Sequence, residues 1–326
     1  MNTKMNIPAV ALGTWSWGVG AVGGNEIFGN NLNEAQLKPV FEAGLQNGLN
    51  LWDTAAVYGM GASETILGDF VKEHPRKDVA ISTKFTPQIA DAASPDPMGA
   101  MLATSLVRFG TDYIDLYWIH NPADVEKWTP GLIPLLKSGR VKHVGVSNHN
   151  LEQIKRVESI LAAEGFGISA VQNHYSLLYR ASEDAGILEY CREKGVAFFA
   201  YMVLEQGALS GKYDTQNPLP EGSQRAARYN PLMPKIESLV AAMKRIGQEH
   251  DATVSQVAIA WAIAKGTTPL VGVTKPSHVE DAAKAARVKL LPQEMEELER
   301  IAANAGVDTR GAWESAMAGG KPWYEK

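Results

Sequence analysis

The feature that most constrains the fold is an alternation of short apolar runs with longer segments of helical pattern. Eight runs rich in Val, Ile and aromatic residues recur along the chain. They cover residues 9–14, 49–54, 79–85, 114–120, 143–147, 170–174, 196–203 and 269–273. The runs are apolar on both faces, which is typical of parallel strands covered by helices. The alternation therefore predicts an α/β fold.

The intervening segments have the spacing of helices. Apolar residues recur there every three or four positions, as at Leu37, Val40, Phe41 and Leu45. This pattern covers residues 33–47, 63–73, 97–110, 151–164, 187–194 and 254–265. A doubly wound sheet would alternate in a similar way, and the count of eight strands is what favours a closed barrel. We expect a (β/α)8 TIM barrel that forms a single domain over residues 1–326.

Two stretches break the alternation, a long loop at residues 204–234 and the C-terminal tail at residues 305–326. In such a barrel the loops that follow the strands lie at the C-terminal face, where active sites are found. We therefore expect both stretches at the active-site face.

Charge and cysteine content exclude several classes of protein. The net charge of −5 argues against a surface for nucleic acid or anionic membranes. Cys191 is the single cysteine, so the chain can form no internal disulfide and no cysteine-based metal cluster. No apolar stretch approaches the ~18 residues that span a bilayer. These features predict a cytoplasmic protein.

Polar residues at the ends of the expected strands are candidates for chemistry, because the interior of a barrel is packed with aliphatic side chains. Asp53 ends the second strand and Tyr58 follows five residues later, while Lys84 ends the third strand and His120 the fourth. Any one of them could be a structural polar group. Together on one rim, they indicate an active site.

The four residue types suit one reaction. A lysine near a tyrosine hydroxyl favours the phenolate and lowers the tyrosine pKa, and an aspartate keeps that lysine charged. A histidine beside the phenol can orient a carbonyl oxygen or pass a proton. The set predicts a general acid that protonates an alkoxide as hydride adds to a carbonyl.

The motifs, taken in order, resemble those of the aldo-keto reductases. They are LGTW at 12–15, DTAxxYG at 53–59, STK at 82–84, IH at 119–120, GVSN at 145–148, VQNxY at 171–175 and GALSGKY at 207–213. The resemblance implies an NAD(P)H-dependent oxidoreductase that reduces a small aldehyde or ketone to an alcohol. It also implies that Asp53, Tyr58, Lys84 and His120 form the catalytic tetrad, with Tyr58 as the general acid.

The resemblance further implies a cofactor site. Thr14 and Trp15 match a contact in the first loop, and Asp53 would lie near the nicotinamide ribose. The residues that match the carboxamide contacts are Ser147, Asn148 and Gln172, and Tyr201 matches the ring on which nicotinamide stacks, although it could be an ordinary core tyrosine. A loop over the pyrophosphate would contribute Leu204, Gly207, Leu209, Ser210 and Lys212, with Arg225 reaching the adenosine end.

The adenosine end and the loop after the seventh strand depart from the family pattern. The positions that match the 2′-phosphate and adenine contacts are Gly272, Thr274, Lys275, His278 and Asp281, but Ala282 replaces the usual asparagine. Thr274 and Lys275 can still accept a phosphate, so we expect NADPH, with NADH as the alternative. Thr274 could equally be a helix N-cap. The loop reads AYMVLEQG where many relatives read AYSPLGRG.

Two further patterns are discounted. Residues 18–23 spell GxGxxG, but no helix opens directly after the strand and Asp53 lies too far on, so we interpret them as a loop and not as a dinucleotide-binding turn. His143, His149 and His174 have no carboxylate or cysteine partner at ligand spacing, so we expect no metal.

Two other functions remain open at this point. A lysine at a barrel mouth suits a Schiff-base lyase when its pKa is depressed, and Lys84 stands at such a position, although Asp53 would keep it charged. The chain could also be a non-enzymatic, NADP(H)-binding regulatory subunit, since barrels of this family also serve as partners of membrane proteins.

Overall fold

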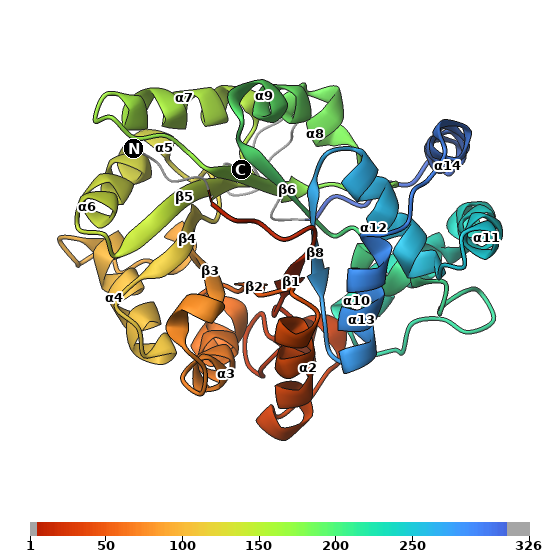
Figure 1. The fold of residues 1–326 in the computed structure, drawn as a ribbon, viewed down its shortest axis with the longest axis horizontal. Coiled ribbons are helices and arrows are strands. Elements are labelled where there is room, and N and C mark those ends of the chain that lie inside the picture. Colours follow the sequence, from red (N-terminus) through yellow and green to blue (C-terminus); the bar gives the residue numbers. More distant parts are fainter. Residues whose placement is uncertain (1–4, 312–326) are drawn as a thin grey trace.

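The computed structural model of the chain describes residues 5–311. Eight parallel strands form a closed barrel in chain order, and the last strand pairs with the first (Figure 1). The strands are β1 (Ala11–Gly13), β2 (Leu51–Asp53), β3 (Ala80–Phe85), β4 (Ile114–Ile119), β5 (Val141–Ser147), β6 (Ala170–His174), β7 (Ala197–Tyr201) and β8 (Thr268–Gly272). The predicted (β/α)8 barrel is confirmed, and a doubly wound sheet is excluded.

Helices form the outer ring around these strands (Figure 1). The six segments with helical spacing are α2 (Glu34–Gln46), α3 (Ala62–Val71), α4 (Pro97–Phe109), α7 (Leu151–Ala162), α9 (Ile187–Lys194) and α12 (Val254–Ala264). The structure adds α1 (Gly24–Phe28), α5 (Val125–Trp128), α6 (Leu132–Lys137), α8 (Ala181–Asp184), α10 (Gln224–Tyr229), α11 (Met233–Glu249), α13 (Pro276–Ala285) and α14 (Pro292–Asn304). In residues 5–311, no helix is both long and apolar enough to cross a bilayer.

Local sequence sets where three of the principal helices begin. Asn33, Asn150 and Thr253 each precede a helix, and each side chain accepts a hydrogen bond from the backbone of a glutamine three residues on. The glutamine side chain bonds back to the capping residue, which completes a capping box. The limits of α2, α7 and α12 lie within two residues of the predicted ones.

The barrel interior holds a small apolar cluster, separate from the larger core between strands and helices. Its fully buried members are Ala11, Leu51, Leu116, Trp118, Ala170 and Phe199. Gly145 on β5 makes room for the indole of Trp118, because a Cβ there would lie 2.4 Å from Trp118 Cζ3. The floor beneath the strand ends is therefore densely packed, and polar groups above it have a fixed base.

The segment after β7 differs from the predicted continuous loop. It contains the 3-10 turn η5 (Glu205–Ser210) and the short helix α10, and α11 already begins at Met233. From the predicted tail, Thr309 contacts this segment, donating from its hydroxyl to Glu205 Oε1 at 3.1 Å. Residues 312–326 of the tail lie outside the described residues.

The GxGxxG stretch lies in the turn between β1 and α1, as predicted. Gly18 and Gly20 have φ of +78° and +119°, which glycine adopts readily. A Cβ at Gly18 would lie 2.9 Å from Ala62 Cβ, so the turn packs closely against the start of α3. It belongs to the barrel rim and forms no dinucleotide-binding turn.

Candidate active site

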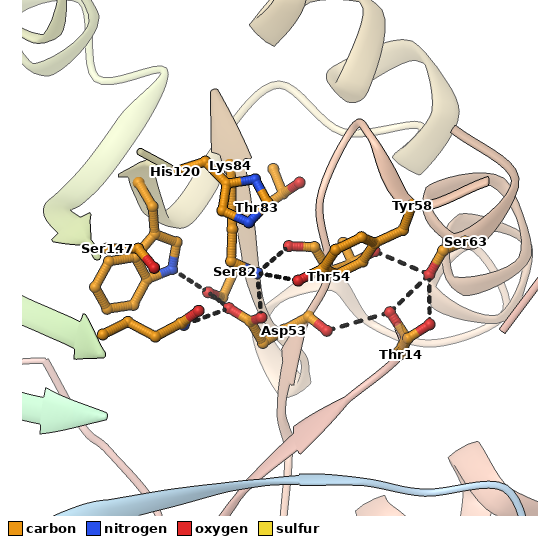
Figure 2. Close-up of polar contacts among 12 residues, drawn as sticks. Thr14, Asp53, Thr54, Tyr58, Ser63, Ser82, Thr83, Lys84, His120 and Ser147 are labelled. Atoms are coloured by element: carbon orange, nitrogen blue, oxygen red, sulfur yellow. Dashed lines mark hydrogen bonds and ion pairs between the residues drawn. The ribbon is translucent and has the colours of Figure 1, made fainter. Parts of the chain in front are cut away.

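A buried ion pair forms the base of the site. Lys84 near the end of β3 is fully buried, and its ammonium donates to Asp53 Oδ1 at the end of neighbouring β2. It also donates to the Thr54 carbonyl at 2.7 Å. The second carboxylate oxygen of Asp53 accepts from Ser82 Oγ at 2.7 Å and from Gln172 Nε2 at 3.1 Å. Figure 2 shows this network converging on Asp53.

Tyr58 lies above the ion pair. It opens the 3-10 turn η1 (Tyr58–Gly61) that follows β2, and its hydroxyl accepts from Lys84 Nζ at 3.4 Å. The indole of Trp15 stacks on the phenol ring, with centroids 5.6 Å apart and an interplanar angle of 22°. The hydroxyl therefore lies within reach of the lysine that was predicted beside it.

A hydroxyl network holds the turn that carries Tyr58. Ser63 on α3 donates to the Thr14 carbonyl at 2.8 Å, and its oxygen also lies 2.8 Å from Thr14 Oγ1 and 3.0 Å from Thr54 Oγ1. All three residues are fully buried. Thr14 thus has a structural role in joining the first loop to the second strand, in addition to the predicted cofactor contact.

His120 approaches Tyr58 from the end of β4. Its ring meets the phenol nearly edge-on, with centroids 5.9 Å apart and an interplanar angle of 80°. Nδ1 shares a hydrogen bond of 2.8 Å with Thr86 Oγ1, which leaves Nε2 available. Burial, assisted by the charge of Lys84, places the pKa of His120 well below its usual value, so the ring is neutral at physiological pH.

The pKa of Tyr58 is raised, contrary to the prediction from residue types. Burial of the phenol is the largest cause, and the charge of Lys84, which lowers the pKa, does not overcome it. Burial also acts to lower the pKa of Lys84, but Asp53 and Tyr58 raise it above its usual value. At neutral pH the site therefore holds a protonated tyrosine beside a charged lysine and a neutral histidine.

The predicted carboxamide contacts follow the next strands. Ser147 ends β5, Asn148 follows it with a φ of +63°, and Gln172 lies on β6. The hydroxyl of Tyr201 at the end of β7 donates to Asn148 Oδ1 at 2.5 Å, and Asn148 Nδ2 donates to the His120 carbonyl at 3.0 Å. Tyr201 is therefore joined to the strand end that carries His120 and is not an isolated core tyrosine.

The residues that were predicted to contact the pyrophosphate lie in the segment after β7, and they differ in how exposed they are. Gly207 has a φ of +105°, Lys212 is exposed, and Ser210 Oγ donates back to the Gly207 carbonyl at 2.6 Å. Leu204 is half-buried, whereas Leu209 is fully buried in the hydrophobic core, so only the backbone of Leu209 could meet a ligand. Arg225 Nε is buried and has no hydrogen-bond partner within residues 5–311.

The predicted phosphate contacts gather where β8 meets α13. Gly272 is exposed and faces open space, and the exposed Lys275 is the N-cap of α13. The alternative interpretation of Thr274 as the N-cap is therefore wrong. The backbone of Thr274 donates to His278 Nδ1 at 3.3 Å, and Asp281 accepts from Gln256 Nε2 at 2.7 Å.

Sequence reasoning missed several polar partners. Ser82 lies within β3 and Thr86 directly follows it, and nothing in the strand pattern indicates that they orient Asp53 and His120. Glu205 was noted only as a departure, although it lies 2.9 Å from His174 Nε2. Of the other two histidines considered as metal ligands, His143 contacts Ser169 and His149 contacts the Ser147 carbonyl. The part of the chain that the structure describes has no group of three residues suited to a metal ion.

Comparisons with known proteins identify the family of the chain. The model of the Aldo/keto reductase family matches residues 9–303. The chain belongs to this family. Its predicted membership is thereby confirmed, and as a family member it is an oxidoreductase enzyme.

Three relatives illustrate the likeness. Pyridoxal reductase of Arabidopsis thaliana, named as chloroplastic, is 32% identical and covers 91% of this chain and 84% of its own. The aldo-keto reductase yakc [NADP(+)] of Schizosaccharomyces pombe is 29% identical and covers 89% of each chain. The structure of a glycerol dehydrogenase from Gluconobacter oxydans superimposes with a TM-score of 0.79 at 24% identity, covering 95% of this chain and 97% of its own.

Proposed function

We propose that this reductase uses NADPH to reduce an aldehyde or ketone to an alcohol, with Tyr58 as the general acid. The observation that carries the proposal is the contact of the Tyr58 hydroxyl with Lys84, whose ammonium is itself held by Asp53. A protonated phenol beside a fixed positive charge can give up its proton as negative charge develops on a carbonyl oxygen.

Each residue of the tetrad has a separate task in this scheme. Tyr58 donates its hydroxyl proton to the substrate oxygen, and Lys84 stabilises the phenolate that remains. Asp53 keeps Lys84 charged and pointed at the phenol. His120, neutral and bonded through Nδ1 to Thr86, can orient the carbonyl oxygen from the other side. NADPH, when bound, supplies the hydride that reaches the carbonyl carbon.

Several features of the structure fit a dinucleotide phosphate. Arg225 Nε is buried without a partner in the described chain, as expected for a group that awaits an acceptor. Gly272 leaves open space beside the backbone, and the exposed Lys275 lies at the N-terminus of α13, where an anion is favoured. The name of the Schizosaccharomyces pombe relative also includes NADP(+). NADPH is therefore preferred to NADH.

The electrostatics argue against a Schiff-base lyase. Imine formation needs a neutral amine, which calls for a lysine pKa depressed towards neutrality. Asp53 and Tyr58 instead raise the pKa of Lys84, despite the opposing effect of burial. A regulatory subunit without turnover is disfavoured by membership of an oxidoreductase family, and the experiment below tests that alternative directly. The single-domain organisation over residues 1–326 and the cytoplasmic location stay predictions.

The test measures turnover and binding separately. Purified protein is mixed with NADPH and a panel of aldehydes and ketones. Oxidation of NADPH is followed by absorbance, and binding of NADPH is followed by fluorescence. Tyr58→Phe should lower kcat by at least about a hundredfold with NADPH still bound, the size expected for losing a general acid. Tyr190→Phe is the matched control, because Tyr190 lies on α9 in the outer ring, where its hydroxyl donates to Glu158 Oε2 at 3.0 Å.

The outcomes are distinct. Binding of NADPH without turnover of any carbonyl by the unsubstituted protein would support the regulatory alternative. Turnover that survives in Tyr58→Phe would remove the tyrosine from its role.

A further inference from the structure

A buried carboxylate outside the tetrad joins four parts of the barrel mouth. Glu205 follows β7 and is fully buried. Its oxygens accept from His174 Nε2 at 2.9 Å, from Tyr229 OH at 2.6 Å and from Thr309 Oγ1 at 3.1 Å, and also from Ser176 Oγ. The donors come from the end of β6, the loop after it, α10 and the segment after α14. Few single side chains could connect so many separate elements.

The carboxylate is ionised in this setting. Burial acts to raise the pKa of Glu205, but His174 and the hydroxyl donors outweigh it, and the pKa lies below its usual value. Hydrogen bonds to a charged acceptor are stronger than neutral ones, and a donor left without its buried acceptor is costly. The four segments are therefore held more firmly than by neutral contacts.

The backbone around Glu205 is strained. Glu205 and Gln206 have φ of +46° and +53°, a left-handed conformation that side chains other than glycine rarely adopt, and Gly207 follows at +105°. Such a conformation persists only where its surroundings hold it. This left-handed backbone turns the chain sharply into the segment that is proposed to cover the pyrophosphate.

Helix α10 is hydrogen-bonded to this turn. Arg225 and Tyr229 are four residues apart and so lie on the same face of the helix. Tyr229 bonds the carboxylate of Glu205, and Arg225 Nη1 donates to the neighbouring Gln206 carbonyl at 3.3 Å. One face of α10 is thus fastened to two consecutive residues, and this contact presents Arg225 beside Gly207.

The same carboxylate reaches the nicotinamide side. His174 stacks on Tyr201, with centroids 5.6 Å apart and an interplanar angle of 25°, and the two residues are register partners on β6 and β7. Glu205 therefore links the ring proposed to support nicotinamide with the helix that carries Arg225. The two ends of the expected dinucleotide site are connected through one side chain.

We propose that Glu205 is a positioning residue that fastens α10 over the dinucleotide and sets how slowly NADPH leaves. The inference rests on the proposed function, because it assumes that NADPH lies between α10 and Tyr201. It assigns Glu205 no part in the transfer of hydride or proton. Loss of its charge should therefore shorten the lifetime of the complex and leave the chemical step unchanged.

The experiment compares Glu205→Gln with the unsubstituted protein. NADPH dissociation is followed by stopped-flow fluorescence after addition of excess NADP⁺, and the hydride-transfer rate is measured in single turnovers. We expect the dissociation rate to rise at least about tenfold, as for the loss of a charged hydrogen bond, with a single-turnover rate within about twofold. Tyr229→Phe removes one donor and keeps the ring, so a smaller rise in the same direction is expected.

Glu64→Gln is the matched control. Glu64 is also fully buried, and its carboxylate accepts hydrogen bonds from the Thr83 hydroxyl and from the Arg108 guanidinium. It lies on α3, however, and not on the segment after β7. It should change stability and leave NADPH dissociation unchanged. If Glu205→Gln does not fold, Tyr229→Phe decides the matter.

The results separate the two proposals. Unchanged dissociation in Glu205→Gln, or in Tyr229→Phe where only that variant folds, would overturn the positioning role while NADPH turnover stands. An equal rise in Glu64→Gln would reduce the effect to general destabilisation and also overturn it. Absence of NADPH binding by the unsubstituted protein would instead remove the proposed function itself.

Discussion

The pair of Lys84 and Asp53 allows a quantitative test of the site's electrostatics. The side chains are 0% and 2% exposed, so neither charge is screened by water. Removing one partner of a buried pair leaves the other charge uncompensated, at a cost of about 3–5 kcal/mol. In Asp53→Asn the amide oxygen can still accept from Lys84, and the Thr54 carbonyl remains at 2.7 Å. We therefore expect Asp53→Asn to lower the free energy of unfolding by about 3 kcal/mol, the lower end of this range.

The reverse change has a similar cost for a different reason. Lys84→Met removes the ammonium and leaves the Asp53 carboxylate buried, with Ser82 and Gln172 as its remaining donors. We again expect a loss of about 3 kcal/mol in the free energy of unfolding. The double variant carries neither charge, so it should be less destabilised than the sum of the two by about 2–3 kcal/mol.

The assay is urea unfolding followed by far-UV circular dichroism for the four proteins of this cycle. The exposed pair of Lys137 and Glu164 provides a parallel cycle, in which a much smaller coupling is expected. In Asp53→Asn the folded-state pKa of Lys84 falls below its unfolded value, so the deficit should shrink as pH rises towards that value. Losses that add within about 0.5 kcal/mol would refute the reasoning, since they would mean that the two charges do not interact.

Three further predictions concern catalysis, specificity and packing. Because His120 is neutral and Tyr58 protonated, kcat/KM for carbonyl reduction should not change between pH of about 6.5 and 9, and an inflection there would contradict these pKa directions. Lys275→Ala should raise KM for NADPH about tenfold and leave KM for NADH unchanged, whereas equal changes would remove Lys275 from 2′-phosphate recognition. Gly145→Ala should cost about 1–3 kcal/mol in urea unfolding through collision with Trp118, whereas Gly272→Ala, with open space around it, should be neutral; equal losses would refute the packing argument.

Much of the fold could be predicted because its signals are local. The strand that ends at Asp53 and the one that carries Lys84 were each located by a short apolar run, and α2 was located by apolar residues that recur every three or four positions. The four candidate residues were grouped by position, since polar residues at the ends of parallel strands must share one rim, and the family resemblance supplied their proposed catalytic roles. Helix α11 was partly taken for a loop, because its start at Met233 lies in a proline-containing stretch without a polar capping bond.

Long-range polar partners could not be predicted. Glu205 bonds His174, which precedes it by 31 residues, and Thr309, which follows it by 104, and no periodic pattern links them. The pKa of Tyr58 was mispredicted for a related reason. Residue types indicated the lysine that lowers the pKa, whereas the larger effect, burial of the phenol, depends on how the surrounding loops pack.

The raised pKa of Tyr58 follows from the same burial that gives Lys84 its effect. In open solvent a lysine would stabilise the phenolate of a neighbouring tyrosine only weakly, because water screens the charge. Under the Trp15 indole the phenol is desolvated, which keeps the proton on Tyr58 at neutral pH. In the proposed reaction Lys84 would then act on the phenolate at full strength once the proton has left. Burial thus disfavours early ionisation, and the fixed ammonium would stabilise the ionised product. The barrel supports this arrangement because Asp53 is itself bonded by Ser82 and Gln172, so the charge that holds Lys84 is fixed from two neighbouring directions.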